Sequence, residues 1–487
     1  MLEILLPELF LSSSLILLLT FAVIYAKVNG KYSQQYKITI LSIIVLLITL
    51  ILNFNNFNII FYDEIFYSNS LIVFFKVLIL LSSIVVLFWS FDFYKKDNLT
   101  DFEFPLLILF ACLGMLFLVS SHNLLMFYLS IELFSLSLYV LATFQRDKYS
   151  NTEAGLKYFL LGALSSGILL LGCTLLYLYT GEITFYGIHN FIYFSYSDQF
   201  PTLLGGLFLI IGILFKLAAA PFHNWAPDVY EGTSTIITGF FSIVPKLATF
   251  SVLITLLYYV FNNLDFYFIL VISIISSFII GSIGGLYQTK IKRLFAYSAI
   301  GHVGFILLGL ISGYNLLNLQ SSLIYLVIYI IMNFITFSIL LYFYDNNITG
   351  NFIVELSGLS RFNPIIAITF VLNLLSLAGI PPLAGFFSKF LIFMSALQNE
   401  FYILSLIAIV GSVISCFYYL RVIKWIYMKH NLTYTYKNLA DITIKRNNIN
   451  LVNSLILGIS LFIIISFILY PNPIFIISFD VLSNFII

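Results

Sequence analysis

Five ionisable side chains lie inside long apolar stretches of the sequence, where a charge is costly. They are Lys76, Glu132, Lys216, Lys246 and Lys389. A charged side chain at the centre of a bilayer costs about 2.5–3.5 kcal/mol on insertion scales. Each of them therefore requires a hydrated interior in which ions move, a static charged partner, or a route for its head group to the membrane surface.

Lysine and glutamate together provide the chemistry of proton transfer. Burial favours the neutral form of a lysine, whereas a neighbouring carboxylate favours the charged ammonium. Movement or screening of Glu132 would therefore load or unload a proton on a nearby lysine. The residues to which we assign proton transfer are Glu132, Lys216, Lys246 and Lys389. The alternative is a static ion pair between Glu132 and one lysine. For Lys76 we favour a side chain that extends to the interface over a functional role.

One histidine also lies within an apolar stretch. His302 follows the segment Tyr297–Gly301, and an imidazole exchanges protons near physiological pH. His302 is a candidate proton relay, with a packed histidine that only makes hydrogen bonds as the favoured alternative. We find no nucleotide-binding loop, haem-type ligand pair, metal-ligand spacing or catalytic triad. The sequence therefore predicts no cofactor and no metal on this chain.

Two of the apolar stretches are interrupted by proline close to a lysine. Pro221 closes a Leu-Ala-Ala-Ala-Pro segment directly after Lys216, and Pro381 and Pro382 precede Lys389. Each proline removes a backbone donor and crowds the carbonyl four residues before it. The carbonyls freed in this way are those of Leu217, Leu377 and Ala378. Freed carbonyls at membrane depth are tolerated only against protein or water, so we predict that both breaks line a hydrated cavity.

The composition predicts an all-α polytopic membrane protein. Of 487 residues, 61% are hydrophobic and only 9% are charged. Many apolar runs reach the roughly 17–25 residues that a helix needs to span a bilayer. Inside lipid only helices or a closed barrel satisfy the backbone, and these runs lack the alternation of barrel strands. The net charge of +1 indicates no nucleic-acid partner.

We predict about 14 transmembrane helices from these runs. They lie near residues 5–26, 38–54, 70–91, 104–120, 123–144, 154–180, 203–222, 233–260, 264–286, 293–312, 320–344, 364–396, 402–427 and 450–470. Apart from the buried lysines, every Lys and Arg falls in or beside a loop after an odd-numbered span. Because basic loops stay on the matrix or cytoplasmic side, we place these loops inside and both termini outside. The exception is the loop after the seventh span, which carries Asp228 and Glu231.

The two proline breaks predict an inverted repeat. They occur in the seventh and twelfth spans, and an odd offset places the two copies in opposite orientations in the membrane. Ion-coupled transporters use such inverted repeats, with broken helices at the site. We therefore divide the chain into 1–103 with three N-terminal spans, 104–260 as the first five-helix repeat, 261–430 as the second, and 431–487 with the last span and a tail along the surface.

These segments resemble the antiporter-like membrane subunits of respiratory complex I, and in particular the NADH dehydrogenase subunit 2 family. The resemblance covers nearly the whole chain and is carried by Leu129–Leu133, Phe215-Lys216, Pro221–Gly232, Pro245-Lys246, Ala296–His302 and Gly379–Phe390. It implies 14 helices and proton transfer along a central hydrated axis, driven by NADH oxidation and quinone reduction in other subunits. In the family's pattern Glu132 pairs with Lys216. Lys246 links the two half-channels, and Lys389 serves the exit side.

The resemblance also implies partners and a location. FMN, iron–sulfur clusters and ubiquinone would belong to the rest of the complex. The partners would be antiporter-like subunit 4, the small core membrane subunits and lipids. The membrane would be the mitochondrial inner membrane or, alternatively, a bacterial plasma membrane. Subunit 4, an autonomous cation/proton antiporter and a scaffold without proton transfer remain as alternatives. Lys389 favours subunit 2, because subunit 4 usually has Glu at that position.

Overall fold

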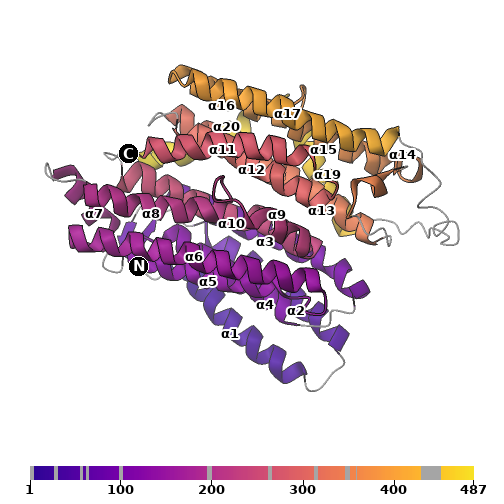
Figure 1. The fold of residues 1–487 in the computed structure, drawn as a ribbon. Helices are drawn as coiled ribbons and strands as arrows, with labels where there is room; N and C mark the ends of the chain where they lie inside the picture. The colour runs from indigo at the N-terminus through magenta and orange to yellow at the C-terminus, as the bar shows by residue number, and fades with distance from the viewer. Residues whose placement is uncertain are drawn as a thin grey trace.

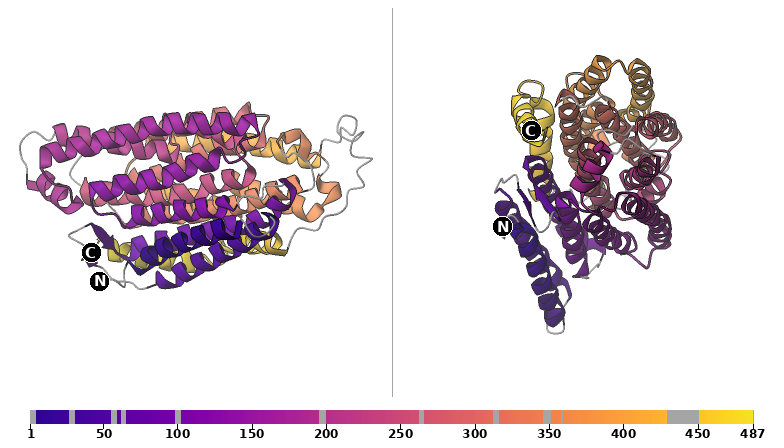
Figure 2. Two further views of the ribbon diagram at one scale, coloured as in Figure 1. Left: turned by 90° about the horizontal axis from the view of Figure 1, so that it is seen from below. Right: turned by 90° about the vertical axis from the view of Figure 1, so that its left-hand side faces the viewer.

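The computed structural model of the chain is a bundle of long helices that run side by side (Figures 1 and 2). The structure describes residues 5–26, 31–54, 59–61, 65–97, 102–194, 200–261, 266–311, 316–345, 351–357, 359–428 and 451–486. The helical backbone satisfies its own hydrogen bonds, as a lipid environment requires. The apolar runs of the sequence therefore become the rods of the bundle.

The first half of the chain contributes most of the uninterrupted helices. These are α1 (Leu6–Ala26), α2 (Lys31–Leu52), α3 (Ser70–Asp97), α4 (Glu103–Ser120), α5 (Leu124–Ala142), α6 (Tyr149–Thr180), α7 (Phe185–Phe194), α8 (Phe200–Leu217), α9 (Trp225–Gly232) and α10 (Thr235–Thr255), which the π-helical turn η1 (Leu256–Val260) extends. The short strands β1 (Ile59–Phe61) and β2 (Phe66–Ser68) pair antiparallel between α2 and α3.

The second half has shorter pieces among its long helices. They are α11 (Tyr267–Leu286), α12 (Ile291–Ile311), α13 (Leu316–Asp345), the 3-10 turn η2 (Ile353–Leu356), α14 (Leu359–Phe362), α15 (Pro364–Ala378), α16 (Ala384–Gln398), α17 (Tyr402–Tyr427), α19 (Leu451–Ser466) and α20 (Asn472–Ile486). Five of the basic residues that we predict on the inner side lie outside the described residues. They are Lys27, Lys429, Lys437, Lys445 and Arg446.

The number of spans agrees with the prediction. Among the described residues, 12 helices are long and apolar enough to cross a membrane. The predicted twelfth span is divided between α15 and α16, with 15 residues each, and the predicted fourteenth corresponds to the 16 residues of α19. The prediction of an all-α membrane fold with about 14 spans is therefore confirmed. The division into two inverted repeats stays a prediction.

The break in the seventh span comes earlier than predicted. Helix α8 ends at Leu217 rather than at residue 222, and Ala218 adopts a positive φ of 59°. That conformation is uncommon for alanine and turns the chain out of the helix before Pro221 is reached. The chain resumes as the short helix α9, so the region after Lys216 is an ordered turn with a helix of its own.

Three helices occupy the centre of the bundle. In α10, α12 and α13 most residues are buried, and α10 packs against both of the others. These helices carry Lys246, His302 and Tyr329 respectively. Helices α6, α11 and α17 lie further out and leave many large apolar side chains exposed. Lys246, His302 and Tyr329 are therefore on the helices that lie farthest from the lipid.

The C-terminal tail is a helix that packs on the body. Helix α20 lies against α3 and α13 (Figure 2). Ser70 at the start of α3 donates a hydrogen bond of 2.8 Å to the carbonyl of Val481. Gln320 on α13 donates one of 3.0 Å to the carbonyl of Phe475. The tail runs along the surface as predicted, and it also joins the N-terminal helices to the second half of the chain.

Candidate functional site

Lys216 lies in the last turn of α8, where the helix ends. Its side chain is buried, and Nζ donates a hydrogen bond of 3.1 Å to the hydroxyl of Tyr139 on α5. The same ammonium lies 5.5 Å from the centre of the Tyr139 ring, within cation–π range. The immediate partner of this lysine is therefore a tyrosine hydroxyl, a group that both donates and accepts protons in hydrogen bonds.

Glu132 lies on the same helix α5, about two turns before Tyr139. Its Oε1 is buried and has no hydrogen-bond partner among the described residues. Glu132 and Lys216 form no ion pair in the structure, and Lys216 contacts Tyr139 instead. The direct pair that the resemblance implied is thus absent here. A buried carboxylate oxygen without a partner is costly, and it leaves Glu132 with unused capacity to accept a proton or a hydrogen bond.

The turn after Lys216 is held by Trp225 at the start of α9. The indole nitrogen of Trp225 donates a hydrogen bond of 2.9 Å to the carbonyl of Phe215, in the last turn of α8. Its ring stacks on Tyr158 of α6 at 4.8 Å between centroids, and Tyr158 in turn meets Tyr139 edge to face at 4.9 Å. The aromatic contacts fix the end of α8 relative to α5 and α6, and they thereby orient Lys216.

Tyr139 reaches Lys216 because α6 has a glycine opposite its ring. A Cβ atom at Gly162 would lie 2.1 Å from the hydroxyl oxygen of Tyr139, which is far inside contact distance. Small residues on a membrane helix allow a neighbouring helix to pack closely. Gly162 does so at the position where the packed group is the partner of Lys216.

Lys246 lies in the middle of α10 and is buried. Its Nζ donates a hydrogen bond of 3.2 Å to the hydroxyl of Tyr329 on α13 and lies 5.3 Å from the centre of that ring. Lys246 and Tyr329 also line a small cavity together with Leu217, the residue after Lys216, and Val303, the residue after His302. The cavity is large enough for about one water molecule. It lies where the two halves of the predicted path meet.

His302 is completely enclosed and touches three tyrosines. Its Nδ1 lies 2.6 Å from the hydroxyl of Tyr325 and its Nε2 lies 3.3 Å from the hydroxyl of Tyr419. The imidazole ring is also 5.3 Å from the ring of Tyr329, the partner of Lys246. Both ring nitrogens have hydroxyl partners, so this geometry suits a relay and equally satisfies a packed histidine. The relay role stays a prediction.

Lys389 bonds to the carbonyls that the prolines free. Its Nζ donates to the carbonyl of Leu377 at 3.0 Å and to that of Ala378 at 2.8 Å. The ammonium lies 5.1 Å from the centre of the Phe305 ring. Gly379 makes this possible, because it has a φ of 86° and a Cβ there would lie 2.8 Å from Cδ of Lys389. The sequence correctly predicted which carbonyls the second break would free.

Lys76 does not extend to the membrane surface, so that interpretation was wrong. Its side chain is 4% exposed and forms a salt bridge and hydrogen bond with Glu8 of α1, whose side chain is fully buried. The buried pair compensates both charges without contact with the headgroups, although one oxygen of Glu8 stays without a partner among the described residues. The pair joins α1 to α3, within the three N-terminal spans.

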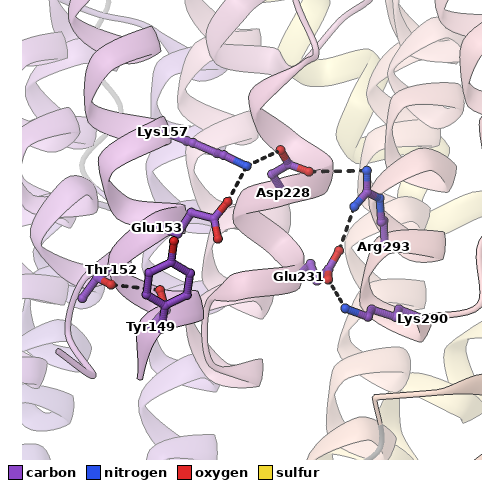
Figure 3. Close-up of polar contacts among 8 residues, drawn as sticks. All are labelled: Tyr149, Thr152, Glu153, Lys157, Asp228, Glu231, Lys290 and Arg293. Atoms are coloured by element: carbon purple, nitrogen blue, oxygen red, sulfur yellow. Dashed lines mark hydrogen bonds and ion pairs between the residues drawn. The ribbon is translucent and has the colours of Figure 1, made fainter. Parts of the chain in front are cut away.

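Acidic and basic side chains form a network at the end of the bundle that was predicted to face inward (Figure 3). Lys157 of α6 contacts Asp228 of α9 at 3.0 Å, and Asp228 lies 3.4 Å from Arg293 of α12. Arg293 also contacts Glu231 at 2.9 Å, and Glu231 forms an ion pair with Lys290. The network joins the two predicted repeats, because α6 and α9 belong to the first repeat and Lys290 and Arg293 to the second.

The network explains why one inner loop appeared to break the charge pattern. Asp228 and Glu231 belong to the loop after the seventh span, and their partners are basic residues from other loops at the same end. Burial raises the pKa of Glu231, but hydrogen bonds from Lys290 and Arg293 outweigh the burial and hold its pKa below the usual value. Glu231 therefore stays charged, and its ion pairs together with those of Asp228 compensate the basic loops around them.

Sequence reasoning missed the tyrosines of the site. They are Tyr139, Tyr325, Tyr329 and Tyr419, and all are buried. The sequence has 33 tyrosines, many of which face lipid or the ends of helices, so residue type alone does not identify these four. The available signal was position, because a phenol in the middle of an apolar span needs a hydrogen-bond partner.

The fold is shared with known membrane proteins. Residues 121–415 match the family described as NADH:quinone oxidoreductase/Mrp antiporter, transmembrane. The chain resembles a structure of respiratory complex I from Thermus thermophilus with a TM-score of 0.77 and 26% identity, covering 96% of this chain and 98% of the other. It also resembles a structure of the Mrp complex from Dietzia sp. with a TM-score of 0.80 and 18% identity, which is evidence for the fold alone. The chain belongs to the NADH:quinone oxidoreductase/Mrp antiporter family of membrane proteins.

Curated relatives narrow the assignment within that family. NADH-quinone oxidoreductase subunit N of Pelagibacter ubique is 43% identical over 431 residues, which is 88% of this chain and 89% of the relative. NADH-ubiquinone oxidoreductase chain 2 of Marchantia polymorpha is 39% identical over 486 residues, covering 97% and 96%. The chain is thus a member of the subunit N/chain 2 branch, in agreement with the resemblance drawn from its motifs.

Proposed function

We propose that this chain is a proton-translocating membrane subunit of an NADH:quinone oxidoreductase of the complex I type. One observation carries the proposal. Tyr329 contacts both Lys246 and His302, from the centres of three adjoining helices, so proton-exchanging groups are continuous across the middle of the bundle. Buried titratable groups of this kind are costly, and inside a membrane they mark ion pathways and proton relays.

The first half of the path runs from Glu132 to Lys246. The free oxygen of Glu132 receives a proton, and Tyr139 on the same helix connects it toward Lys216. The proton then passes from Lys216 to Lys246 when the space beside Leu217 is hydrated, since the small cavity there has an apolar lining and does not by itself hold water. Water completes the remaining gap between Glu132 and Tyr139, because a bridging water is nearly as good as a direct hydrogen bond.

The second half runs from Lys246 to Lys389. Tyr329 and His302 carry the proton from Lys246 toward Tyr325. The ring of Phe305 stacks on Tyr325 at 5.6 Å and lies 5.1 Å from the ammonium of Lys389. Phe305 carries no proton itself, so water beside its ring completes the step from Tyr325 to Lys389. Lys389, held by backbone carbonyls, serves as the exit residue.

The energy for the transfer comes from the rest of the complex. No redox centre is assigned to this chain, and FMN, iron–sulfur clusters and ubiquinone belong to other subunits. The partners are antiporter-like subunit 4, the small core membrane subunits and lipids. Relatives of the chain come from bacteria and from plants, and we assign it to the mitochondrial inner membrane, with the bacterial plasma membrane as the alternative.

A lysine substitution in the assembled complex tests the proposal. Lys246→Ala removes the group that joins the two halves, and we expect fewer protons moved per electron while the amount of complex is unchanged. Arg361→Ala, an exposed residue at the end of the bundle, is the control. An unchanged proton-to-electron ratio in Lys246→Ala would contradict the proposal.

A separate measurement distinguishes an autonomous antiporter. The isolated chain in vesicles should show no sodium-driven proton flux, because its path depends on other subunits for a driving force. Sodium-driven flux from the chain alone would favour the antiporter alternative. Normal pumping after joint loss of Glu132 and Lys216 would favour the scaffold alternative.

A further inference from the structure

An open hollow lies at the inner end of α17, away from the proposed proton path. It is a broad surface hollow that is open to its surroundings. Three segments form its walls, namely the end of α17, the turn between α11 and α12, and η2. The lining residues on which the argument rests are Phe417, Leu420, Arg421, Lys424 and Trp425.

Two positive charges in the hollow have no acidic partner among the described residues. Arg421 donates to the backbone carbonyl of Leu286 at 2.6 Å and to that of Gln288, and its Nε is buried without a partner. These bonds fix the guanidinium in place and leave its charge uncompensated. Lys424 is exposed, one turn further along the same face of α17. Glu355 of η2 does not line the hollow.

Along this face of α17, apolar side chains are followed by cationic ones, in the same order as the acyl chains and the phosphate of a phospholipid. Phe417 and Leu420 are 64% and 45% exposed and continue the apolar face of a helix long enough to span the membrane. Arg421 and Lys424 follow toward the helix end, and Trp425 lies beside them. Acyl chains require an exposed apolar surface, a phosphate requires fixed cations, and Trp is typical of the level between them.

We propose that this hollow binds the phosphate headgroup of an anionic phospholipid of the inner leaflet, with the acyl chains along Phe417 and Leu420. The cations of Arg421 and Lys424 hold the phosphate, and their net positive charge selects anionic over zwitterionic lipid. Arg and Lys near the cytoplasmic or matrix face attract anionic headgroups in this way.

Photo-cross-linking in the purified complex tests the site. The complex is placed in phosphatidylcholine vesicles that contain a trace of phosphatidylglycerol with a diazirine on its acyl chain. We expect label on the peptide that contains Phe417 and Leu420. Lys424→Glu should lower that label about fivefold, as the loss of a basic residue near a charged surface predicts. Lys424→Arg, which keeps the charge, should retain it.

Two controls test whether the hollow binds a lipid or free phosphate. Lys148→Glu changes an exposed lysine at the same end of the bundle, outside the hollow, and should leave the label unchanged. Excess inorganic phosphate should also leave the label unchanged, because a lipid is held by its chains as well. Loss of label with phosphate would indicate a site for free phosphate and overturn the lipid proposal. Equal labelling of the wild type and Lys424→Glu would also overturn it. An unlabelled peptide that a neighbouring subunit covers would overturn it as well.

Discussion

The two broken helices solve the same chemical problem in different ways. At the first break, the indole of Trp225 donates to the carbonyl of Phe215, and Lys216 is left to contact Tyr139. At the second break no such donor intervenes, and Lys389 itself bonds to the carbonyls of Leu377 and Ala378. A helix end buried without partners is costly, so both breaks need a donor.

The difference teaches which lysine is free to act alone. Lys216 has a neutral hydroxyl as its partner, and its removal leaves the turn intact because Trp225 still supports it. Lys389 has both a structural and a chemical role, because its ammonium also donates hydrogen bonds to the free backbone carbonyls at the break. The two lysines occupy matching places in the sequence pattern, and their contacts make them unequal.

The largest expected effect separates the two lysines directly. Lys389→Met leaves two buried carbonyls without a donor, at about 1–3 kcal/mol for each. We expect both less assembled complex and no pumping. Lys216→Met should abolish pumping with normal assembly. The amount of intact complex on native gels and the proton-to-electron ratio check this. Equal assembly of both variants would remove the contrast.

Trp225→Phe should lower the stability of the first break, at the end of α8. The variant keeps the aromatic ring and loses the N–H that bonds to Phe215, so the carbonyl loses its side-chain donor. The carbonyl of Phe215 still accepts a hydrogen bond of 3.0 Å from the backbone nitrogen of Ala218, so we expect a loss of only about 0.5–1.5 kcal/mol in stability and slower pumping. The temperature of thermal inactivation of the purified complex measures the loss of stability. If Trp225→Phe inactivates at the wild-type temperature, the indole does not support the turn.

Gly162→Ala should disturb Lys216 through its partner. The new methyl group would lie 2.1 Å from the Tyr139 hydroxyl and must displace it, at a cost of about 1–3 kcal/mol. Gly167→Ala on the same helix is the matched control, because nothing lies within 4 Å of its Cβ position. We expect reduced pumping only in the first variant. Similar pumping rates in the two variants would mean that Tyr139 does not matter to Lys216.

Tyr329→Phe should affect the junction between the halves without affecting assembly. The variant removes only the hydroxyl that accepts a hydrogen bond from Lys246, a net contribution of about 0.5–1.5 kcal/mol. We expect pumping to slow by up to about tenfold, since 1.4 kcal/mol is a factor of ten. Proton flux during NADH oxidation measures it. A wild-type rate would show that the path bypasses Tyr329.

The smallest effect is expected at the network of exposed charges. Exposed ion pairs contribute about 0–1 kcal/mol each, and salt weakens them. Lys290→Glu should slightly lower thermal stability at low salt, and the exchange of charges in Lys290→Glu with Glu231→Lys should restore it. Because the pKa of Glu231 lies below 4.5, its contribution is complete above that pH and is lost as the pH falls through the lowered value. An equal loss at high salt would contradict this account.

Much of this arrangement is encoded locally and could be predicted. Apolar length gives the spans, and proline chemistry gives the carbonyls of Leu377 and Ala378. What could not be predicted depends on neighbours that are distant in the sequence. The pairing of Lys76 with Glu8 needs α1 and α3 to be placed together, and the choice of Tyr139 over Glu132 needs the exact rotation of α5. The turn at Ala218 was missed because alanine gives no sign of a positive φ.

Helix α20 has a consequence for the order in which the chain is completed. Its carbonyl at Val481 receives the hydroxyl of Ser70, so the interface of α3 is closed by a segment that the ribosome makes after nearly all of the others. Until then the side of α3 that α20 covers lacks its partner. The packing of the three N-terminal spans is therefore completed late in folding.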